Sequence, residues 1–251
     1  MKSMILKSII FSILLTLIFR SCSYAQASSG EKCQPVKIAV LQDLTGSVHS
    51  NDVPILQMGD VEALIKILHR CGGELGFGSI SENSNKRLAR LIIETPPIEP
   101  IEPDKKGNPY KAARLHSEYK EQLTKYQALN AEWTQRNKAD IDKFKKDVQK
   151  ILRGRVAHRS DIWSAVKRAD FFLSEDNSAW QTDIQLYVIF ITDGDDNVGG
   201  KKISNFNKQT KTIIVPGSAG VLAIFNPLKF ESIDSALRFL NKQTSTKERS
   251  K

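Results

Sequence analysis

The stretch VKIAVLQDLTGS, residues 36–47, joins a nearly continuous apolar run to a polar loop that contains an aspartate and two hydroxyl side chains. Residues 36–42 are rich in β-branched and other apolar side chains, a pattern typical of a strand covered on both faces in a parallel sheet. Asp43 follows this run, and Thr45 and Ser47 come two and four residues after Asp43. The stretch therefore predicts a buried strand that delivers a carboxylate and two hydroxyls to one loop.

Apolar patterns beyond this strand alternate between helical and strand periods. The expected helices are residues 54–70, 160–173 and 233–240, and the expected further strands are residues 74–81, 87–94, 184–192, 211–215 and 221–225. Strands 74–81 and 87–94 are expected to form a hairpin-like pair, and either Ser160 or Asp161 is expected to cap the second helix. Strands that alternate with helices form a mostly parallel sheet with helices on both faces. We therefore expect a doubly wound α/β fold over residues 33–245, with its ligand site at the carboxyl ends of the strands.

One segment, residues 95–153, interrupts this alternation and is expected to be an insertion. Its first part, TPPIEPIEPDKKGNP at residues 95–109, contains five prolines and predicts an extended, exposed connector. Residues 110–152 carry a thin apolar stripe at helical spacing and predict one helix, or two helices broken near Asn137. Between residues 105 and 155, basic side chains outnumber acidic ones roughly two to one, which indicates a solvated basic face. We hypothesise that this helical arm widens or covers the binding face of the sheet.

The N-terminal residues 1–25 are typical of an export signal. Two lysines accompany the apolar run 8–19, which is too short to span a bilayer comfortably. Small side chains place the cleavage after Ala25 or Ala27. A membrane anchor and lipid attachment at Cys22 are the alternatives. The sequence thus predicts a periplasmic or secreted protein with no transmembrane segment after removal of the signal.

The cysteines fit an oxidising compartment. If Cys22 leaves with the signal, Cys33 and Cys71 are the remaining thiols. One precedes the first strand and the other follows the helix at 54–70, and a helix packed antiparallel to its strand ends near the point where that strand began. A disulfide between them is the simplest account. Two unpaired buried thiols are the alternative.

Composition limits the classes of function. The chain of 251 residues is 40% hydrophobic, which is enough for a folded core and excludes wholesale disorder. Its formal net charge of +9 favours an acidic partner or surface. The basic segment lacks the interleaved aromatic side chains of a single-strand binder, so no specific nucleic-acid binding is expected. The glycine-rich segment GGELGFG at residues 72–78 leads into a strand instead of opening a helix, so it does not predict a nucleotide-binding loop.

Three short motifs together resemble a known type of metal site. They are DLTGS at residues 43–47, SDI at residues 160–162 and TDG at residues 192–194. The set resembles the metal-ion-dependent adhesion site of the von Willebrand factor A domain family, in which an Asp-x-Ser-x-Ser loop, a Thr on a second loop and an Asp on a third bind one divalent cation. Thr45 stands in place of the first Ser of that pattern and Ser160 in place of the Thr, and both changes retain a hydroxyl.

The resemblance implies a cation site formed by Asp43, Thr45, Ser47, Ser160 and Asp193. By family analogy the three hydroxyls touch the ion, and the two carboxylates act largely through bound waters. A hard cation such as Mg²⁺, or Mn²⁺ in its place, suits oxygen ligands of this kind. Few carboxylates would bind such a cation directly, so it would stay electrophilic and attract an acidic side chain of a protein partner. The resemblance therefore implies metal-dependent protein binding or adhesion, without enzymatic activity.

The same aspartates leave an enzymatic alternative open. DLTGS is similar to the phosphorylated-aspartate loop of haloacid-dehalogenase-type phosphatases, with Asp43 as the nucleophile. Residues 192–197, TDGDDN, are similar to the acidic Mg²⁺ loop of those enzymes. Such phosphatases usually carry a second acid two residues after the nucleophile, where this chain has Thr45, and the motif at residues 160–162 has no part in their mechanism. We therefore favour the adhesion-type site and interpret Asp195 and Asp196 as a solvated acidic turn.

Overall fold

The computed structural model describes residues 33–46, 53–104, 108–154, 156–176 and 184–245. All of them belong to one compact unit, Glu31–Lys251. The expected signal at residues 1–25, with Cys22, lies outside the described residues, and so does Ser47. No helix within the described ranges is long and apolar enough to cross a membrane.

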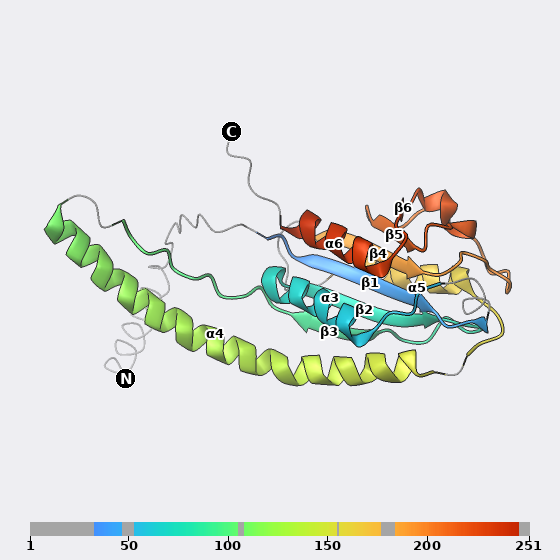
Figure 1. Ribbon diagram of the computed structural model, residues 1–251, viewed down its shortest axis with the longest axis horizontal. Coiled ribbons are helices and arrows are strands. Elements are labelled where there is room, and N and C mark those ends of the chain that lie inside the picture. The colour runs from blue at the N-terminus through green and yellow to red at the C-terminus, as the bar shows by residue number, and fades with distance from the viewer. Residues whose placement is uncertain (1–32, 47–52, 105–107, 155, 177–183, 246–251) are drawn as a thin grey trace, which may run out of the picture. The chain divides into compact units, whose positions relative to one another are not determined.

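A single six-stranded sheet forms the centre of the unit, with strand order β3-β2-β1-β4-β5-β6 (Figure 1). The strands are β1 Val36–Asp43, β2 Gly73–Ile80, β3 Ala89–Ile93, β4 Gln185–Ile191, β5 Lys211–Val215 and β6 Leu228–Lys229. Every neighbouring pair is parallel except β2 and β3, which are antiparallel as the hairpin-like pattern predicted. The strand order reverses between β1 and β4, so the carboxyl ends of these two strands form the topological switch point of the sheet.

Helices cover both faces of the sheet, which confirms the predicted doubly wound α/β class. They are α3 Met58–Cys71, α4 Pro109–Leu152, α5 Ile162–Ser174 and α6 Ile233–Thr244, together with the 3₁₀ helix η1 Gly220–Phe225. Alternate side chains of β1 enter different cores, because successive residues of a strand point to opposite faces. Val36, Ile38 and Val40 pack with α3, α4 and α6. Ala39 and Leu41 pack with α5 and η1.

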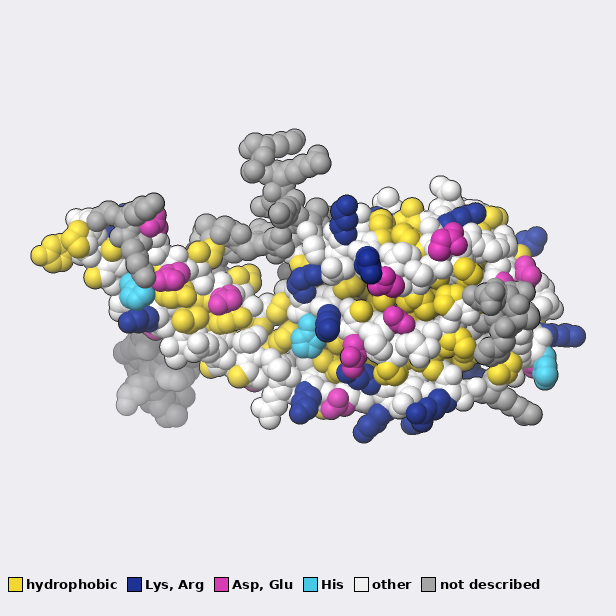
Figure 2. Space-filling view, viewed as in Figure 1, with side chains coloured by type: hydrophobic (Ala, Val, Ile, Leu, Met, Phe, Trp, Pro, Cys, Tyr) yellow, Lys and Arg dark blue, Asp and Glu magenta, His cyan; other side chains and the backbone are white. Residues whose placement is uncertain are grey.

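The basic segment forms one continuous helix, α4, of 44 residues, which is not broken near Asn137. It begins at the Asn108 cap, whose side chain accepts a hydrogen bond from the backbone N–H of Tyr110, with a proline in the first turn. Its C-terminal half buries Trp133, Phe144 and Val148 in the core. Lysines of that half lie exposed along the helix (Figure 2), as expected for a solvated basic face; they include Lys138, Lys143, Lys146 and Lys150. No side chain between residues 108 and 132 is buried.

Residues 221–225, expected to form a strand, lie instead within η1. Their backbone folds back onto the loop after β4, where the N–H of Val221 donates to the Gly194 carbonyl at 2.9 Å. A Cβ at Gly220 would lie 2.0 Å from that same carbonyl oxygen, so only glycine allows this approach. The expectation of a strand was wrong because these apolar residues close a loop. The sheet ends with the short strand β6, which the sequence did not predict.

The expected covalent link is present: a disulfide joins Cys33 and Cys71, with their Cα atoms 4.9 Å apart. Cys71 is the last residue of α3, and Cys33 lies just before β1. The helix therefore returns to the start of its strand, as predicted, and the disulfide ties the two ends together.

Candidate functional site

The polar site lies at the carboxyl ends of β1 and β4. Gln42 of β1 pairs in register with Ile191 of β4, so the residues that follow, Asp43 and Thr192, come side by side at the switch point. Asp193 comes next in the loop after β4. Ligand sites of open α/β sheets occur in the crevice at this position. The fold thus brings together two of the three motifs identified in the sequence.

The Asp43 carboxylate is fully buried and is the centre of a hydroxyl cluster. One oxygen, Oδ1, accepts hydrogen bonds from the Thr45 backbone N–H at 3.0 Å and from the Thr45 hydroxyl at 2.7 Å. The other oxygen, Oδ2, accepts from the Thr192 hydroxyl at 2.7 Å. The Ser160 hydroxyl lies 3.4 Å from Oδ2 and donates to Thr45 Oγ1 at 3.0 Å. Hydroxyls from three separate segments therefore converge on one carboxylate.

A second set of contacts holds the Ser160 loop in place. The backbone N–H of Ser160 donates to Asn197 Oδ1 at 2.7 Å, and the N–H of Asn197 donates back to the Ser160 carbonyl at 3.2 Å. Residues 45 and 157 form an isolated parallel bridge, with the N–H of Gly46 donating to the Ala157 carbonyl at 3.0 Å. The loop that carries Ser160 is thus joined through its own backbone groups to the segments of both other motifs.

The N-terminus of α5 is capped by two acidic residues. Asp161 is the N-cap, and its side chain accepts from the Ser164 N–H, which decides between the two expected caps. Asp196 accepts from the N–H of Ile162 at 2.8 Å and from the N–H of Gly199 at 3.0 Å. The interpretation of Asp196 as part of a solvated turn was therefore wrong, because its carboxylate satisfies backbone donors at a helix N-terminus. Asp195 is exposed, as expected.

Asp193 contributes the second carboxylate at the switch point. It is 8% exposed, and its Oδ1 accepts a hydrogen bond from the N–H of Asp195 at 3.1 Å. The following Gly194 has φ of 83° and lies against the backbone of residues 219–220. That left-handed conformation turns the chain sharply at the end of β4 and keeps Asp193 at the edge of the crevice.

Burial and a neighbouring carboxylate both disfavour the charged form of Asp43. Burial raises the pKa of Asp43 above its ordinary value, while the hydrogen bonds from Thr192 and Thr45 lower it. The charged group that acts on it is a second carboxylate, Asp193, which raises the pKa of Asp43 further. Two carboxylates so placed are stabilised by a cation between or beside them.

The donor set of this cluster fits a hard cation. All of its candidate donor atoms are carboxylate or hydroxyl oxygens, which Mg²⁺ and Mn²⁺ accept. Within the described part of the chain, no group of three or more His, Cys, Asp and Glu side chains has the arrangement of a metal centre. A cation at the switch point would therefore depend on hydroxyl ligands, here Thr45 and Ser160 beside Asp43 and Asp193.

The sequence patterns did not identify two residues of the site, Thr192 and Gln42. Thr192 donates directly to Asp43, and its signal was a hydroxyl at the end of an apolar strand in the same motif as Asp193. Gln42 is fully buried; its Oε1 accepts from the Leu56 N–H at 2.9 Å and its Nε2 donates to the Asp43 carbonyl at 3.0 Å. It fixes the segment before α3 against the end of β1, and its signal was a polar side chain inside an apolar run.

Neither the known family profiles nor the curated protein sequences contain a match to this chain. Among solved structures, proximal thread matrix protein 1 from the mussel byssus is similar with a TM-score of 0.43 and 14% identity, over 85% of this chain and 47% of that one. The open conformation of the pilus adhesin SpaC from Lactobacillus rhamnosus GG is similar with a TM-score of 0.41 and 12% identity, over 84% of this chain and 30% of the adhesin. The chain spans about half the length of the mussel protein and less than a third of the adhesin.

Proposed function

We propose that this chain is a von Willebrand factor A-like domain that binds Mg²⁺ or Mn²⁺ at the switch point of its sheet and uses the cation to bind a protein. The proposed ligand residues are Asp43, Thr45, Ser160 and Asp193, with Ser47, which lies outside the described residues. One observation carries the proposal: hydroxyls from separate segments converge on the buried Asp43 carboxylate. An oxygen-only cluster with two carboxylates has the chemistry of a hard-cation site.

The roles of the chain's own residues follow from their hydrogen bonds. The Thr45 hydroxyl donates its proton to Asp43 at 2.7 Å and accepts from the Ser160 hydroxyl at 3.0 Å, and these two hydroxyl oxygens would be the ones to contact a cation. Thr192 holds the other oxygen of Asp43 and thereby fixes the orientation of the carboxylate. When bound, a divalent cation supplies a coordination position for an acidic side chain of the partner.

The buried state of Asp43 favours binding over phosphoryl transfer. Both of its oxygens accept hydrogen bonds from hydroxyls, and its side chain has no exposed surface. A nucleophile needs an oxygen within reach of the reacting phosphorus atom. In addition, Thr45 occupies the position at which the phosphatase pattern has a second acid. We therefore propose a binding protein rather than an enzyme.

The wider properties of the chain agree with an exported binding protein. The disulfide between Cys33 and Cys71 is typical of an oxidising compartment. The formal net charge of +9 favours acidic partners, and exposed lysines lie along α4. We propose a periplasmic or secreted location and a partner that presents a carboxylate to the cation.

The decisive experiment is calorimetric titration of Mg²⁺ and Mn²⁺ into the purified protein, with hydrolysis of p-nitrophenyl phosphate measured on the same samples. Wild type should bind one cation without turnover of the ester, and Asp43→Ala should abolish binding. Asp195→Ala is the matched control, because Asp195 is an exposed acid of the same site loop, and it should bind normally. Turnover that depends on the metal and disappears in Asp43→Ala would instead establish the phosphatase alternative, and a folded wild type that binds no cation would refute the proposal.

A further inference from the structure

A cavity of about 400 Å³ lies between the C-terminal half of α5 and the segment 85–90, which leads into β3. This volume is within the range of pockets that bind small molecules, about 300–1,000 Å³. Arg87, Arg90, Arg168, Phe171, Phe172 and Glu175 line it. None of these side chains takes part in the hydroxyl cluster around Asp43, so the cavity belongs to a different part of the molecule.

Two glycines of β2 lie directly beneath side chains that line this cavity. A Cβ at Gly78 would lie 2.9 Å from Nη2 of Arg168, and a Cβ at Gly76 would lie 3.0 Å from Cζ of Phe172. Real side chains do not approach so closely, so the two glycines allow Arg168, Phe172 and Leu88 to pack directly on the strand. Gly76 and Gly78 thus have a structural role, because they make room for side chains that line the cavity.

Arg168 is a partly desolvated cation, and not all of its N–H donors have an acceptor among the described residues. Its Nη1 donates to the Lys86 carbonyl at 2.6 Å and its Nη2 to the Ser79 carbonyl at 2.8 Å. A guanidinium has five N–H donors, and the Nε donor of Arg168 is buried with no acceptor among the described residues. Burial lowers the pKa of Arg168 to about 10, which still leaves it charged at neutral pH. The carboxylate that acts on it, Asp161, forms no ion pair with it within the described ranges.

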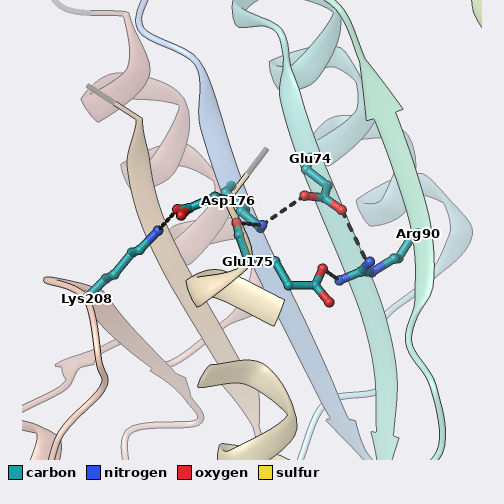
Figure 3. A network of polar contacts seen from close by, with 6 residues as sticks. Glu74, Arg90, Glu175, Asp176 and Lys208 are labelled. Carbon is teal, nitrogen blue, oxygen red and sulfur yellow. Dashed lines mark hydrogen bonds and ion pairs between the residues drawn. The ribbon is translucent and has the colours of Figure 1, made fainter. Parts of the chain in front are cut away.

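The positive charge of the third lining arginine, Arg90, is balanced by acidic side chains (Figure 3). Arg90 forms an ion pair with Glu175 and lies 3.8 Å from Glu74, whose other oxygen contacts Lys37 Nζ at 3.0 Å. Lys37 also donates to the Glu175 carbonyl at 2.9 Å. Two cations and two carboxylates therefore cancel in this network. The positive charges of Arg87 and Arg168 remain, because the described residues form no ion pair with either.

Two phenylalanines and Leu88 supply the apolar part of the wall, beside the exposed Asn85. Phe171 is 67% exposed. The neighbouring Phe172 is buried, and the Arg90 guanidinium lies 4.9 Å from the centroid of its ring. An exposed aromatic ring beside two uncompensated arginines matches a ligand that has an apolar part and an anionic part.

We propose that this cavity binds a small organic acid, in which one or two carboxylate charges are attached to an aromatic or branched apolar body. Arg168 and Arg87 would hold the carboxylate, since a guanidinium pairs with carboxylate oxygens in a bidentate geometry. Phe171 and Phe172 would contact the apolar body. A free acid and the carboxyl terminus of a peptide that ends in an apolar residue present the same chemistry.

The test titrates two acids, 3-phenylpropionate and acetyl-Gly-Gly-Phe, and the neutral amide of each into the full protein by calorimetry. Buffers free of divalent cations keep the Asp43 site out of the measurement, and Asp43→Ala should bind both acids as wild type does. We expect each acid that binds to do so at least tenfold more tightly than its amide, which corresponds to about 1.4 kcal/mol. Tighter binding of the tripeptide would identify a peptide terminus as the source, and tighter binding of the free acid a small molecule.

Three variants localise the binding. Arg87→Gln should weaken the acids about tenfold and leave the amides unchanged, and because Arg87 is exposed, the variant should fold normally. Phe171→Ala should weaken acids and amides alike. Arg238→Gln, which alters an exposed arginine of α6, is the control and should change neither. Equal affinity of acids and amides, no effect of Arg87→Gln, or no binding at millimolar acid would overturn the proposal.

Discussion

Thr192 fixes the position of the central carboxylate of the candidate site. Its hydroxyl donates to Asp43 Oδ2 at 2.7 Å and accepts from the Gly194 N–H at 3.1 Å, with no exposed surface. Thr192→Val keeps the shape but leaves a carboxylate oxygen and a backbone N–H without this partner, at a cost of about 1–3 kcal/mol for each group. We expect urea denaturation to show a loss of that order. Thr192→Ser keeps the hydroxyl and should lose much less; equal losses in the two variants would contradict this role.

Asp43 should make the stability of the metal-free protein depend on pH. Its folded pKa is raised above the ordinary value of 3.8, so between the two pKa values the folded state binds more protons than the unfolded state. The contribution of Asp43 is therefore most favourable below 3.8 and is lost as the pH rises through the folded pKa. An asparagine at this position does not titrate, so the Asp43→Asn variant does not lose this stability as the pH rises.

The stability of Asp43→Asn relative to wild type should thus increase above pH 3.8 and level off above the folded pKa. The slope cannot exceed about 1.4 kcal/mol per pH unit for one proton. Urea unfolding without divalent cations, repeated over this pH range, measures the difference. Asp195→Asn serves as the control for removal of an exposed carboxylate. A constant difference between Asp43→Asn and wild type over this range would mean that the pKa of Asp43 is not raised.

The sequence predicted part of this site because part of it is local. The spacing of two residues places both the N–H and the hydroxyl of Thr45 on Asp43. Thr192 reaches Asp43 only because β4 is the neighbour of β1 in this register, a choice that spacing within one segment does not reveal. The pairing of Asn197 with Ser160 is likewise long-range. The loop residues 47–52, which include one proposed ligand, lie outside the described residues, so Ser47 stays a prediction.

At the scale of elements, the ion pair between Lys37 and Glu74 joins β1 to β2. The two residues are direct partners in the sheet register, their charged atoms are 3.0 Å apart, and their side chains are only 2% and 3% exposed. Glu74→Gln leaves the Lys37 ammonium buried without this carboxylate, and breaking a buried pair in this way costs about 3–5 kcal/mol. Denaturant unfolding should detect a loss of that size.

The matched variants separate charge from packing. The double variant Lys37→Met, Glu74→Leu replaces both charges with apolar side chains of similar size and should recover most of the lost stability. Glu62→Gln, which breaks the more exposed pair with Lys145, should have little effect. If Glu74→Gln were no more harmful than Glu62→Gln, the buried pair would not contribute in the way its burial indicates.

Elements with a clear apolar period were predicted, and the exceptions have physical reasons. The strand and helix patterns matched β1 to β5, α3, α5 and α6, because burial on fixed faces dictates their periods. Residues 221–225 are as apolar as a strand, but the close contact of Gly220 with Gly194 commits their backbone to a loop closure. Asn137 does not break α4, since Trp133 and Phe144 anchor the helix on either side of it. An asparagine costs a helix interior less than about 1 kcal/mol.

At the scale of the whole molecule, α4 connects the core to the candidate site. Its C-terminal half packs in the core through Trp133, Phe144 and Val148. Its last residues lead into the loop whose Ala157 pairs with the segment of Thr45. Removal of the entire segment 95–153 would therefore disturb both the core and the site, so it could not show whether the arm itself contacts a partner.

A narrower excision isolates the outer arm, residues 97–130. The Trp133 indole N–H donates to the Glu94 carbonyl at 3.1 Å, so the chain leaving β3 and the inner half of α4 are already adjacent. A flexible linker of about six glycine and serine residues can span that gap. We expect the excised protein to unfold cooperatively with a Tm within a few degrees of wild type, because residues 108–132 bury no side chain.

Calorimetry on the excised protein then separates two roles of the arm. Cation binding should equal that of wild type, since no proposed ligand residue lies in the removed segment. Trp133→Ala, by contrast, removes a core side chain at the base of the arm and should cost about 3–5 kcal/mol. A large loss of stability on excision would show that the outer arm supports the core. Retained stability and cation binding, together with lost binding of a partner, would place the partner's contact on the arm, where an extended helix increases the reach of the domain beyond its sheet.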